Sequence, residues 1–474
     1  MQQRRIPSDE LRRSTELLTD TSGYASITDD EKDPLIISSN GTSRRKSLIK
    51  TDAPPPPIPK KSERVVSLDA VRGLTIFVMN LVNNAEGSYE ILEHAAWNGL
   101  TLADFVMPFF LFMVGCSIVF SHHRLKKRST RRDILQKSFV RFLKLFALSY
   151  TISFLWMLPQ IDLYSLRLPG VLQRIAMGYL VTVIIELFVP TFDMEDEGLG
   201  VNGYAPPEKG PMAAFWYRLA HGPFRMDDWL QHQGSLAKLA RRFPSKEEIT
   251  SSSLILVTYS LQWMCGLIIL FLYLTLVFGV DVPGCGRGSL TADCNAFSHI
   301  DMTIIRDHHM YQGATCKVME PPCQEFDPEG ILSTIASVVS VIIGMYYGYV
   351  LVNMNRPRAI LNHWLAPSII FLSLGLIIHF FGGFPLNKNM YSPSFLFLMA
   401  GAAGIVLSLF YIVVDVYQIQ KPFMPLIWLG SNSIILYFMD QITPRLISWF
   451  CYNGGDNNLF DLSQKLIYRI MGDK

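Results

Sequence analysis

Long apolar runs constrain what this chain can fold into more than any other feature. A helix needs about 20 apolar residues to cross the ~30 Å hydrocarbon core of a bilayer, and the sequence holds about nine such runs. Half of the 474 residues are hydrophobic and 17% are charged, whereas a soluble protein carries about a quarter charged residues. The sequence therefore predicts an all-α, multi-pass bundle of transmembrane helices. The predicted spans are 65–84, 102–122, 139–158, 169–190, 253–279, 331–352, 364–382, 393–417 and 425–447.

A polar segment, 1–62, precedes the first span and ends in a run of prolines. It is rich in Ser, Thr and charged residues, so it cannot bury enough surface to offset the entropy lost on ordering. We therefore predict a disordered tail. The net charge of the whole chain is only +2, which gives no general reason to expect a nucleic-acid partner.

The loop charges predict which side of the membrane each segment faces. The segment 123–132 holds six Lys and Arg residues, whereas 85–101 holds none. The positive-inside rule therefore places 123–132 and the N-terminus in the cytosol. Counting along the chain then puts the long loop 191–252 in the cytosol and the loop 280–330 on the opposite side. Within the cytosolic loop, 211–222 is amphipathic and fits either an interfacial helix or ordinary loop packing.

Cysteine usage tests this topology independently. Four of the seven cysteines, Cys285, Cys294, Cys316 and Cys323, fall in the loop 280–330. A non-cytosolic compartment is oxidising, so two disulfides are predicted there, with three pairings open. A metal site is the alternative, which the irregular spacing and the absence of a CxxC motif disfavour. The remaining cysteines are predicted to be small packing residues.

The densest polar cluster near a membrane face joins spans one and two on the non-cytosolic side. It includes Asn83, His94, Trp97, Asn98 and Asp104. Imidazole titrates near neutral pH and suits proton transfer, and an Asn amide can donate to a developing oxyanion. This combination fits acyl transfer to an amine or a hydroxyl. A loop histidine that caps a helix is the simpler interpretation, and the residues alone leave both open.

Charged residues also lie inside the predicted spans. Asp69 and Arg72 are three residues apart, which places them on one helix face near the cytosolic end of span one. They fit a structural ion pair or a polar entrance for an anionic ligand. Arg174 lies in span four, where an arginine either pairs with a carboxylate or binds a phosphate or a carbonyl group.

At these residues the sequence resembles a known family. The stretches that carry the likeness are SLDAVRGLTIFVMNLVNN at 67–84, HAAWNGLTLADFVMPFFLFMVG at 94–115 and GVLQRIA at 170–176. Together they resemble heparan-α-glucosaminide N-acetyltransferase, a transmembrane acetyltransferase of lysosomes, and the likeness extends over roughly 64–450. We therefore expect a transmembrane acetyltransferase domain over 63–450.

The resemblance implies transfer of an acetyl group from cytosolic acetyl-CoA to a terminal glucosamine in the lumen, with no metal involved. It implies that His94 is the catalytic residue and that Asn83 belongs to the same active site. His94 would take a proton from the attacking amine in a ternary complex, or carry the acetyl group itself as a nucleophile; we favour the first. The residues expected to line the substrate and acetyl-CoA pocket are Asp69, Arg72, Trp97, Asn98, Asp104 and Arg174.

Two departures from the family pattern modify these expectations. A cytosolic tail stands where the vertebrate enzyme has a lumenal domain and a further span, which suggests a shorter, plant-like form whose acceptor is another amino sugar or amine. The segment 451–474 is too short and polar for the tenth span that the family usually has. The resemblance therefore predicts ten spans in a full-length member and a truncated C-terminus here, whose effect on activity is open.

The tail contains one candidate targeting signal. Glu31, Leu35 and Ile36 fit an acidic dileucine motif that a cytosolic sorting adaptor would bind, although such matches also arise by chance. Together with the family resemblance, this favours a lysosomal or vacuolar membrane. A homodimer stays open. A transporter of a small solute and a catalytically inactive paralogue are the alternatives to an acetyltransferase.

Overall fold

A computed structural model of the chain describes most of the predicted membrane domain. The described residues are 65–85, 90–126, 129–158, 162, 164, 166–189, 258–311, 326–354, 356–449, 465 and 469. Several predictions lie outside them: the tail 1–62 with its dileucine motif, the cytosolic loop 191–252 with its amphipathic piece 211–222, Cys316, Cys323, and nearly all of 451–474.

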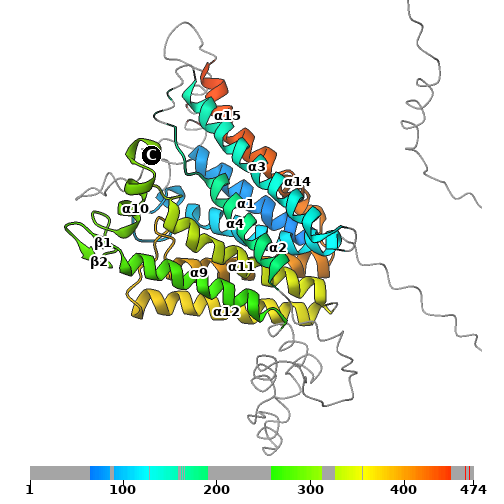
Figure 1. Ribbon diagram of the computed structural model, residues 1–474. Helices are drawn as coiled ribbons and strands as arrows, with labels where there is room; N and C mark the ends of the chain where they lie inside the picture. The colour runs from blue at the N-terminus through cyan, green and yellow to red at the C-terminus, as the bar shows by residue number, and fades with distance from the viewer. Residues whose placement is uncertain are drawn as a thin grey trace, which may run out of the picture. The chain divides into compact units, whose positions relative to one another are not determined.

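The described part of the chain is built almost entirely from helices (Figure 1). The long elements are α1 (Val66–Ala85), α2 (Val106–Lys126), α3 (Arg131–Met157), α4 (Val171–Phe188), α9 (Ser260–Gly279), α11 (Ile331–Asn353), α12 (Pro357–Phe381), α13 (Pro393–Phe410), α14 (Met424–Ser431) and α15 (Ser433–Trp449). The short ones are η1 (Glu90–Leu92), η2 (Leu102–Phe105), β1 (Asp281–Val282), β2 (Gly286–Arg287), α10 (Ala296–Ile304), η4 (Asp307–His309), the π-helix η6 (Tyr411–Val416) and η7 (Lys421–Phe423).

The prediction of an all-α membrane bundle is confirmed. Within the described ranges, eight helices are long and apolar enough to cross a membrane, or nine if α14 and α15 are counted as one bent span. Some helices begin earlier than hydropathy predicts, and α3 begins at Arg131 instead of 139. The reason is a capping box, in which the Thr130 hydroxyl accepts from Asp133 N at 3.3 Å and the Asp133 carboxylate accepts from Thr130 N at 3.2 Å. Such a polar first turn leaves no apolar signal.

The ninth predicted span, 425–447, is not one continuous helix. It is broken between α14 and α15, whose axes differ by 73°. The break follows a very close approach of α14 to α1: a Cβ atom added to Gly430 would lie 1.7 Å from the Asp69 carbonyl oxygen. Two backbones can meet in this way only at glycines, and the following Ser431 and Asn432 are weak helix formers, so the chain turns there.

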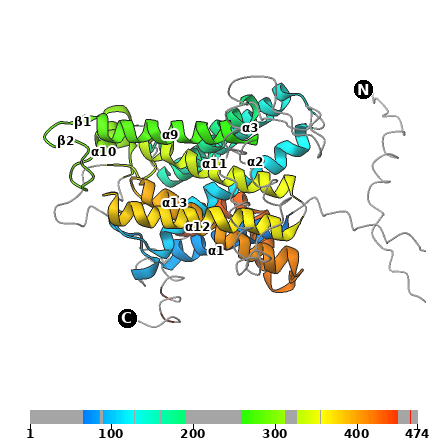
Figure 2. The same ribbon diagram turned by 90° about the horizontal axis from the view of Figure 1, so that it is seen from below.

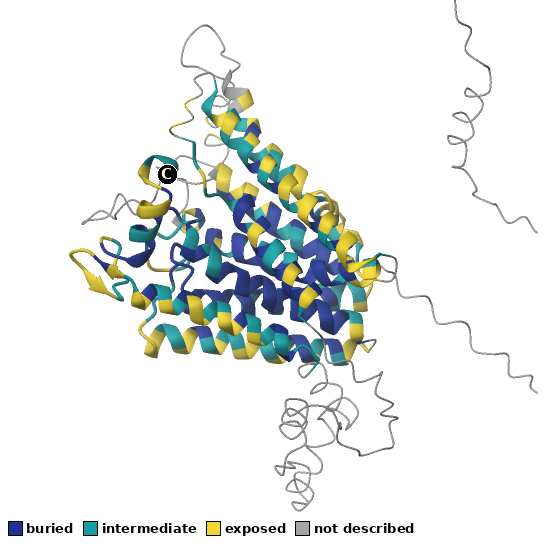
Figure 3. Ribbon diagram, viewed as in Figure 1, coloured by how far each residue is buried: buried dark blue, intermediate teal, exposed yellow. Residues whose placement is uncertain are grey.

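The interior of the bundle is formed around α11, which contacts α2, α4, α9 and α13. In its apolar stretch 89% of the residues are buried, compared with 11% in α3 and 17% in α12 (Figure 3). The helices α3, α9 and α12 present exposed apolar side chains such as Trp156, Phe271 and Phe381. These faces are those expected to meet lipid.

The short elements between α9 and α11 lie at one end of the bundle. Both views show β1, β2 and α10 together at the ends of α9 and α11 (Figures 1 and 2). Here β1 pairs with β2 in antiparallel fashion, and a disulfide joins Cys285 to Cys294. One disulfide is thus present in this loop, as predicted, and it selects Cys285–Cys294 from the pairings that the sequence left open.

Candidate active site

A large cavity of about 1170 Å³ extends along the described bundle between α1, α2, α4 and the broken α14–α15 pair. Its lining follows α1 from Leu68 to Asn83 and α2 from Val106 to Leu125. At 1.5 Å per helical residue these stretches measure roughly 22 and 28 Å, close to the thickness of a hydrocarbon core. The cavity therefore connects the two ends of the bundle, which we call the His94 end and the Arg72 end after lining residues.

His94 lies in the loop between η1 and η2 and is oriented by a buried carboxylate. Its Nδ1 is 3.0 Å from Oδ1 of Asp104, whose side chain is fully buried, whereas the His94 side chain is 31% exposed and lines the cavity. The second oxygen of Asp104 accepts from Thr101 N at 3.1 Å and from the Thr101 hydroxyl at 3.0 Å. Because Asp104 is anchored at the start of η2, it fixes the direction of the imidazole ring. When Nδ1 carries the proton, the lone pair of Nε2 is available as a base.

Lys388 is a third member of this group, and the sequence did not single it out. Its Nζ lies 2.8 Å from Nδ1 and 3.3 Å from Nε2 of His94, and 3.4 Å from Oδ1 of Asp104. Burial lowers the pKa of Lys388, although the carboxylates of Asp104 and Glu329 oppose this effect. Lys388 follows predicted span seven, so the topology places it on the same side as 85–101. Its predicted location on the same side of the membrane as His94 is the sequence signal that could have identified Lys388.

Asn83 lines the same cavity but is held by a different partner. Its amide donates to Oδ2 of Asp440 on α15 at 2.6 Å, and the Asn80 amide donates to Oδ1 of Asp440 at 2.6 Å. Among the described contacts there is no hydrogen bond between Asn83 and His94. The two residues therefore meet through the cavity and not directly, and one of the two N–H groups of the Asn83 amide is already used.

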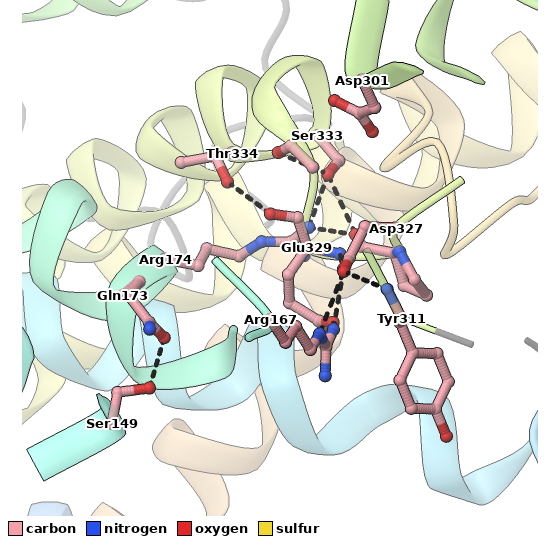
Figure 4. A network of polar contacts seen from close by, with 12 residues as sticks. Ser149, Arg167, Gln173, Arg174, Asp301, Tyr311, Asp327, Glu329, Ser333 and Thr334 are labelled. Atoms are coloured by element: carbon pink, nitrogen blue, oxygen red, sulfur yellow. Dashed lines mark hydrogen bonds and ion pairs between the residues drawn. The ribbon is translucent and has the colours of Figure 1, made fainter. Parts of the chain in front are cut away.

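A network of ion pairs, drawn in Figure 4, includes residues that line the same cavity as His94. Arg167 pairs with Asp327 at 2.7 Å and with Glu329, and its guanidinium lies 4.6 Å from the ring centre of Tyr311. Burial alone would raise the pKa of Glu329, but the cations around it, Arg167 above all, outweigh this and hold the pKa at about 2. Arg167, Tyr311 and Glu329 all line the cavity, so this end carries both a permanent carboxylate and a guanidinium.

Arg174 supports this network from behind and does not line the cavity. The side chain is buried on α4, where its Nη2 donates to the Ser333 hydroxyl at 2.5 Å and to the carbonyl oxygen of Pro328. These partners belong to the protein itself, so binding of a ligand by Arg174 stays a prediction. Arg174 thereby fastens the segment that carries Glu329 to α4 (Figure 4).

Trp97 and Asn98, both expected in the pocket, lie outside its lining. Trp97 Nε1 donates to the carbonyl oxygen of Leu290 at 3.2 Å, and its ring meets Phe326 edge to face at 5.3 Å. The side-chain oxygen Oδ1 of Asn98 accepts from the side-chain amide of Asn387 at 3.2 Å. These two residues attach the His94 loop to neighbouring loops, one of which carries Lys388.

The Arg72 end of the cavity is positively charged. Arg72 pairs with Asp69 at 3.2 Å and donates to the Ser117 hydroxyl at 2.7 Å, and Arg124 and Arg141 line the same end. Asp69 and Arg72 thus form the ion pair considered from the sequence, and both also line the cavity; their role as an entrance for an anionic ligand stays a prediction. Guanidinium groups are well suited to bind phosphate. Among the described residues, no group of three or more His, Cys, Asp or Glu could hold a metal ion.

Comparison with known proteins agrees with the resemblance seen in the sequence. Residues 64–194 match the family model described as heparan-α-glucosaminide N-acetyltransferase, catalytic. The chain is 28% identical over 431 residues to the heparan-α-glucosaminide N-acetyltransferase of Mus musculus, covering 87% of this chain and 58% of that protein. It is 29% identical over 437 residues to the protein of the same name from Homo sapiens, covering 88% of this chain and 59% of the relative. The resemblance is therefore confirmed, and the chain spans less than three-fifths of the length of these relatives.

Proposed function

We propose that this protein is a transmembrane N-acetyltransferase that moves an acetyl group from acetyl-CoA to the amine of a terminal, glucosamine-type sugar. The donor enters at the Arg72 end from the cytosol, and the acceptor binds at the His94 end on the lumenal side. The observation that carries the proposal is the cavity, which joins an Asp-oriented histidine to a cationic end. The names of the similar proteins supply the reaction class.

The Arg72 end fits the phosphorylated part of acetyl-CoA. Three guanidinium groups, those of Arg72, Arg124 and Arg141, line that end, and Asp69 is the carboxylate beside them among the described lining residues. The cavity offers the reactive end of the donor a route to His94, because its lining follows α2 up to Val106, close to the His94 loop. A flexible thioester arm bound by its phosphates would therefore present the acetyl group near His94. The basic segment 123–132 supports a cytosolic Arg72 end.

In the reaction the acceptor nitrogen attacks the carbonyl carbon of the thioester. Nε2 of His94 takes a proton from this nitrogen, the carbon–sulfur bond breaks, and the leaving thiolate receives the proton from His94. Asp104 keeps the ring aligned and, while Nδ1 carries its proton, stabilises the imidazolium between the two transfers. The Asn83 amide stabilises the oxyanion with its second N–H group.

The His94 end supports an acceptor that carries an amine and several hydroxyl groups. Glu329 offers a carboxylate that stays ionised, and Asn389 and Tyr311 add polar lining close by. A carboxylate both attracts an ammonium group and accepts from hydroxyls. The apolar faces of the bundle place the protein in a membrane, and we propose a lysosomal or vacuolar one with the N-terminus in the cytosol.

The test is acetyl transfer by the purified full chain, with labelled acetyl-CoA and a panel of amino sugars and amines. We expect His94→Ala to lower the rate at least about 100-fold while acetyl-CoA still raises the unfolding temperature. His299→Ala is the matched control, because that side chain lies on α10 away from the cavity lining. Full activity of His94→Ala would show that His94 is not the catalytic residue.

The cavity also favours one alternative, a transporter of a small solute, because it extends between both ends of the bundle. Binding of acetyl-CoA distinguishes the two functions. If acetyl-CoA fails to stabilise the protein and a solute crosses proteoliposomes that contain it, the transporter is the better description.

A further inference from the structure

Two opposite charges act on the His94 ring from different elements. Asp104, on η2, contacts Nδ1 at 3.0 Å, and the Lys388 ammonium, from the loop before α13, contacts the two ring nitrogens at 2.8 and 3.3 Å. Asp104 and Lys388 are also 3.4 Å apart. The Lys388 side chain is only 20% exposed, so solvent screens these charges little.

The consequences for His94 follow from the signs of the charges. A carboxylate alone beside an imidazole favours the imidazolium form, so Asp104 by itself would make His94 hold its proton in acid. An ammonium group beside the same ring disfavours imidazolium and offsets this effect. The charged groups that act on Lys388 from farther away are Glu329, next to α11, and Arg174 on α4. Those two carry opposite signs, and Glu329 is itself paired with Arg167 (Figure 4).

We propose that Lys388 is a positioning residue that keeps His94 in its basic, unprotonated form in an acidic compartment. The inference rests on the proposed function, in which His94 is the base on the lumenal side. An Asp–His pair orients the ring, but it also stabilises the proton that the ring must lose before each turnover. Lys388 offsets this effect of the carboxylate at acidic pH. Its ammonium group neutralises the charge of Asp104 and repels the positive charge that the ring would acquire on protonation.

The direct test follows protonation of His94 without requiring turnover. Diethyl pyrocarbonate acylates the neutral imidazole and not the imidazolium. We would measure its rate of reaction with His94 between about pH 5 and 8 by mass spectrometry of the His94 peptide. The pH dependence of that rate gives the midpoint, which is the pH at which half of the His94 side chains are protonated. We expect the midpoint to move up by about one pH unit or more in Lys388→Met, and to stay near the wild-type value in Lys388→Arg. An unchanged midpoint in Lys388→Met would overturn the inference. Lys421→Met, on η7 outside the cavity lining, is the matched control.

The pH profile of acetyl transfer provides the second readout. In Lys388→Met, kcat/KM is expected to fall in acid and to approach the wild-type value as the pH rises, so that the acid limb shifts with the midpoint. A loss by the same factor at every pH would mean that Lys388 is merely structural, and would refute the proposal. The two measurements also separate the hypotheses: absence of acetyl transfer by the wild-type protein would refute the proposed function, whereas an unchanged midpoint in Lys388→Met of an active enzyme would refute this inference alone.

Discussion

Replacing Asp104 by Asn should disable His94 while leaving its side chain in place. The Asp104 carboxylate accepts from Thr101 N at 3.1 Å on one side and faces His94 and Lys388 on the other. In Asp104→Asn the amide oxygen can satisfy only one side. If it stays with Thr101, the new NH₂ group points at the imidazole, so Nδ1 must accept and the proton moves to Nε2. The nitrogen that should act as the base is then occupied.

The structure sets the size of both expected effects. Loss of a correctly oriented general base lowers kcat by about 10²- to 10⁴-fold, with a much smaller change in the KM for acetyl-CoA. Lys388 also loses the partner of a mostly buried ion pair, which costs about 3 kcal/mol of the free energy of unfolding. Steady-state transfer kinetics and thermal unfolding measure the two effects separately. We expect Asp104→Asn to keep its stabilisation by acetyl-CoA.

The control is Asp293→Asn, an exposed carboxylate near α10 that lies outside the cavity lining. If Asp104→Asn kept a kcat within about a factor of two of the wild type, the carboxylate would not be orienting a catalytic base, and the mechanism derived for His94 would be wrong. An equal loss of kcat in Asp104→Asn and Asp293→Asn would contradict the mechanism as well, because only Asp104 contacts the His94 ring.

Three further predictions test other parts of the structure. Arg72→Ala should raise the KM for acetyl-CoA by roughly 10- to 100-fold with little change in kcat, since it removes charge-assisted hydrogen bonds to a phosphate; an unchanged KM would place the donor elsewhere. Gly73→Val should lower the free energy of unfolding by about 3 kcal/mol, because its Cβ would lie 1.8 Å from the Leu426 carbonyl oxygen, whereas Gly279→Ala meets nothing within 4 Å and should be neutral in the same thermal assay. Burial raises the pKa of Asp301 to about 7, so the folded state binds a proton that the unfolded state releases near pH 4, and stability falls as the pH rises from about 4 to 7. Asp301→Asn should therefore gain more in unfolding temperature at about pH 8 than at about pH 5, and a gain independent of pH would contradict this sign.

Much of the architecture could be predicted from the sequence because the membrane acts on local composition. A bilayer core accepts only apolar helices, so each long apolar run specifies one element without reference to the others. The same local logic identified the segment that holds His94 and Asp104, which lie ten residues apart and form their contact within one loop. The disulfide between Cys285 and Cys294 also closes a short loop, nine residues along the chain.

Contacts between distant segments could not be predicted in this way, and they decide how the site is built. Lys388 reaches His94 across 294 residues, and Asp440 holds Asn83 across 357. The break between α14 and α15 follows from the packing of Gly430 on α1, which no property of span nine reveals. The sequence by itself therefore determined which segments enter the membrane and which short loop carries the candidate base. Only the tertiary structure decided which charges surround that base and where a cavity remains, because these depend on how closely the backbones of separate helices approach one another.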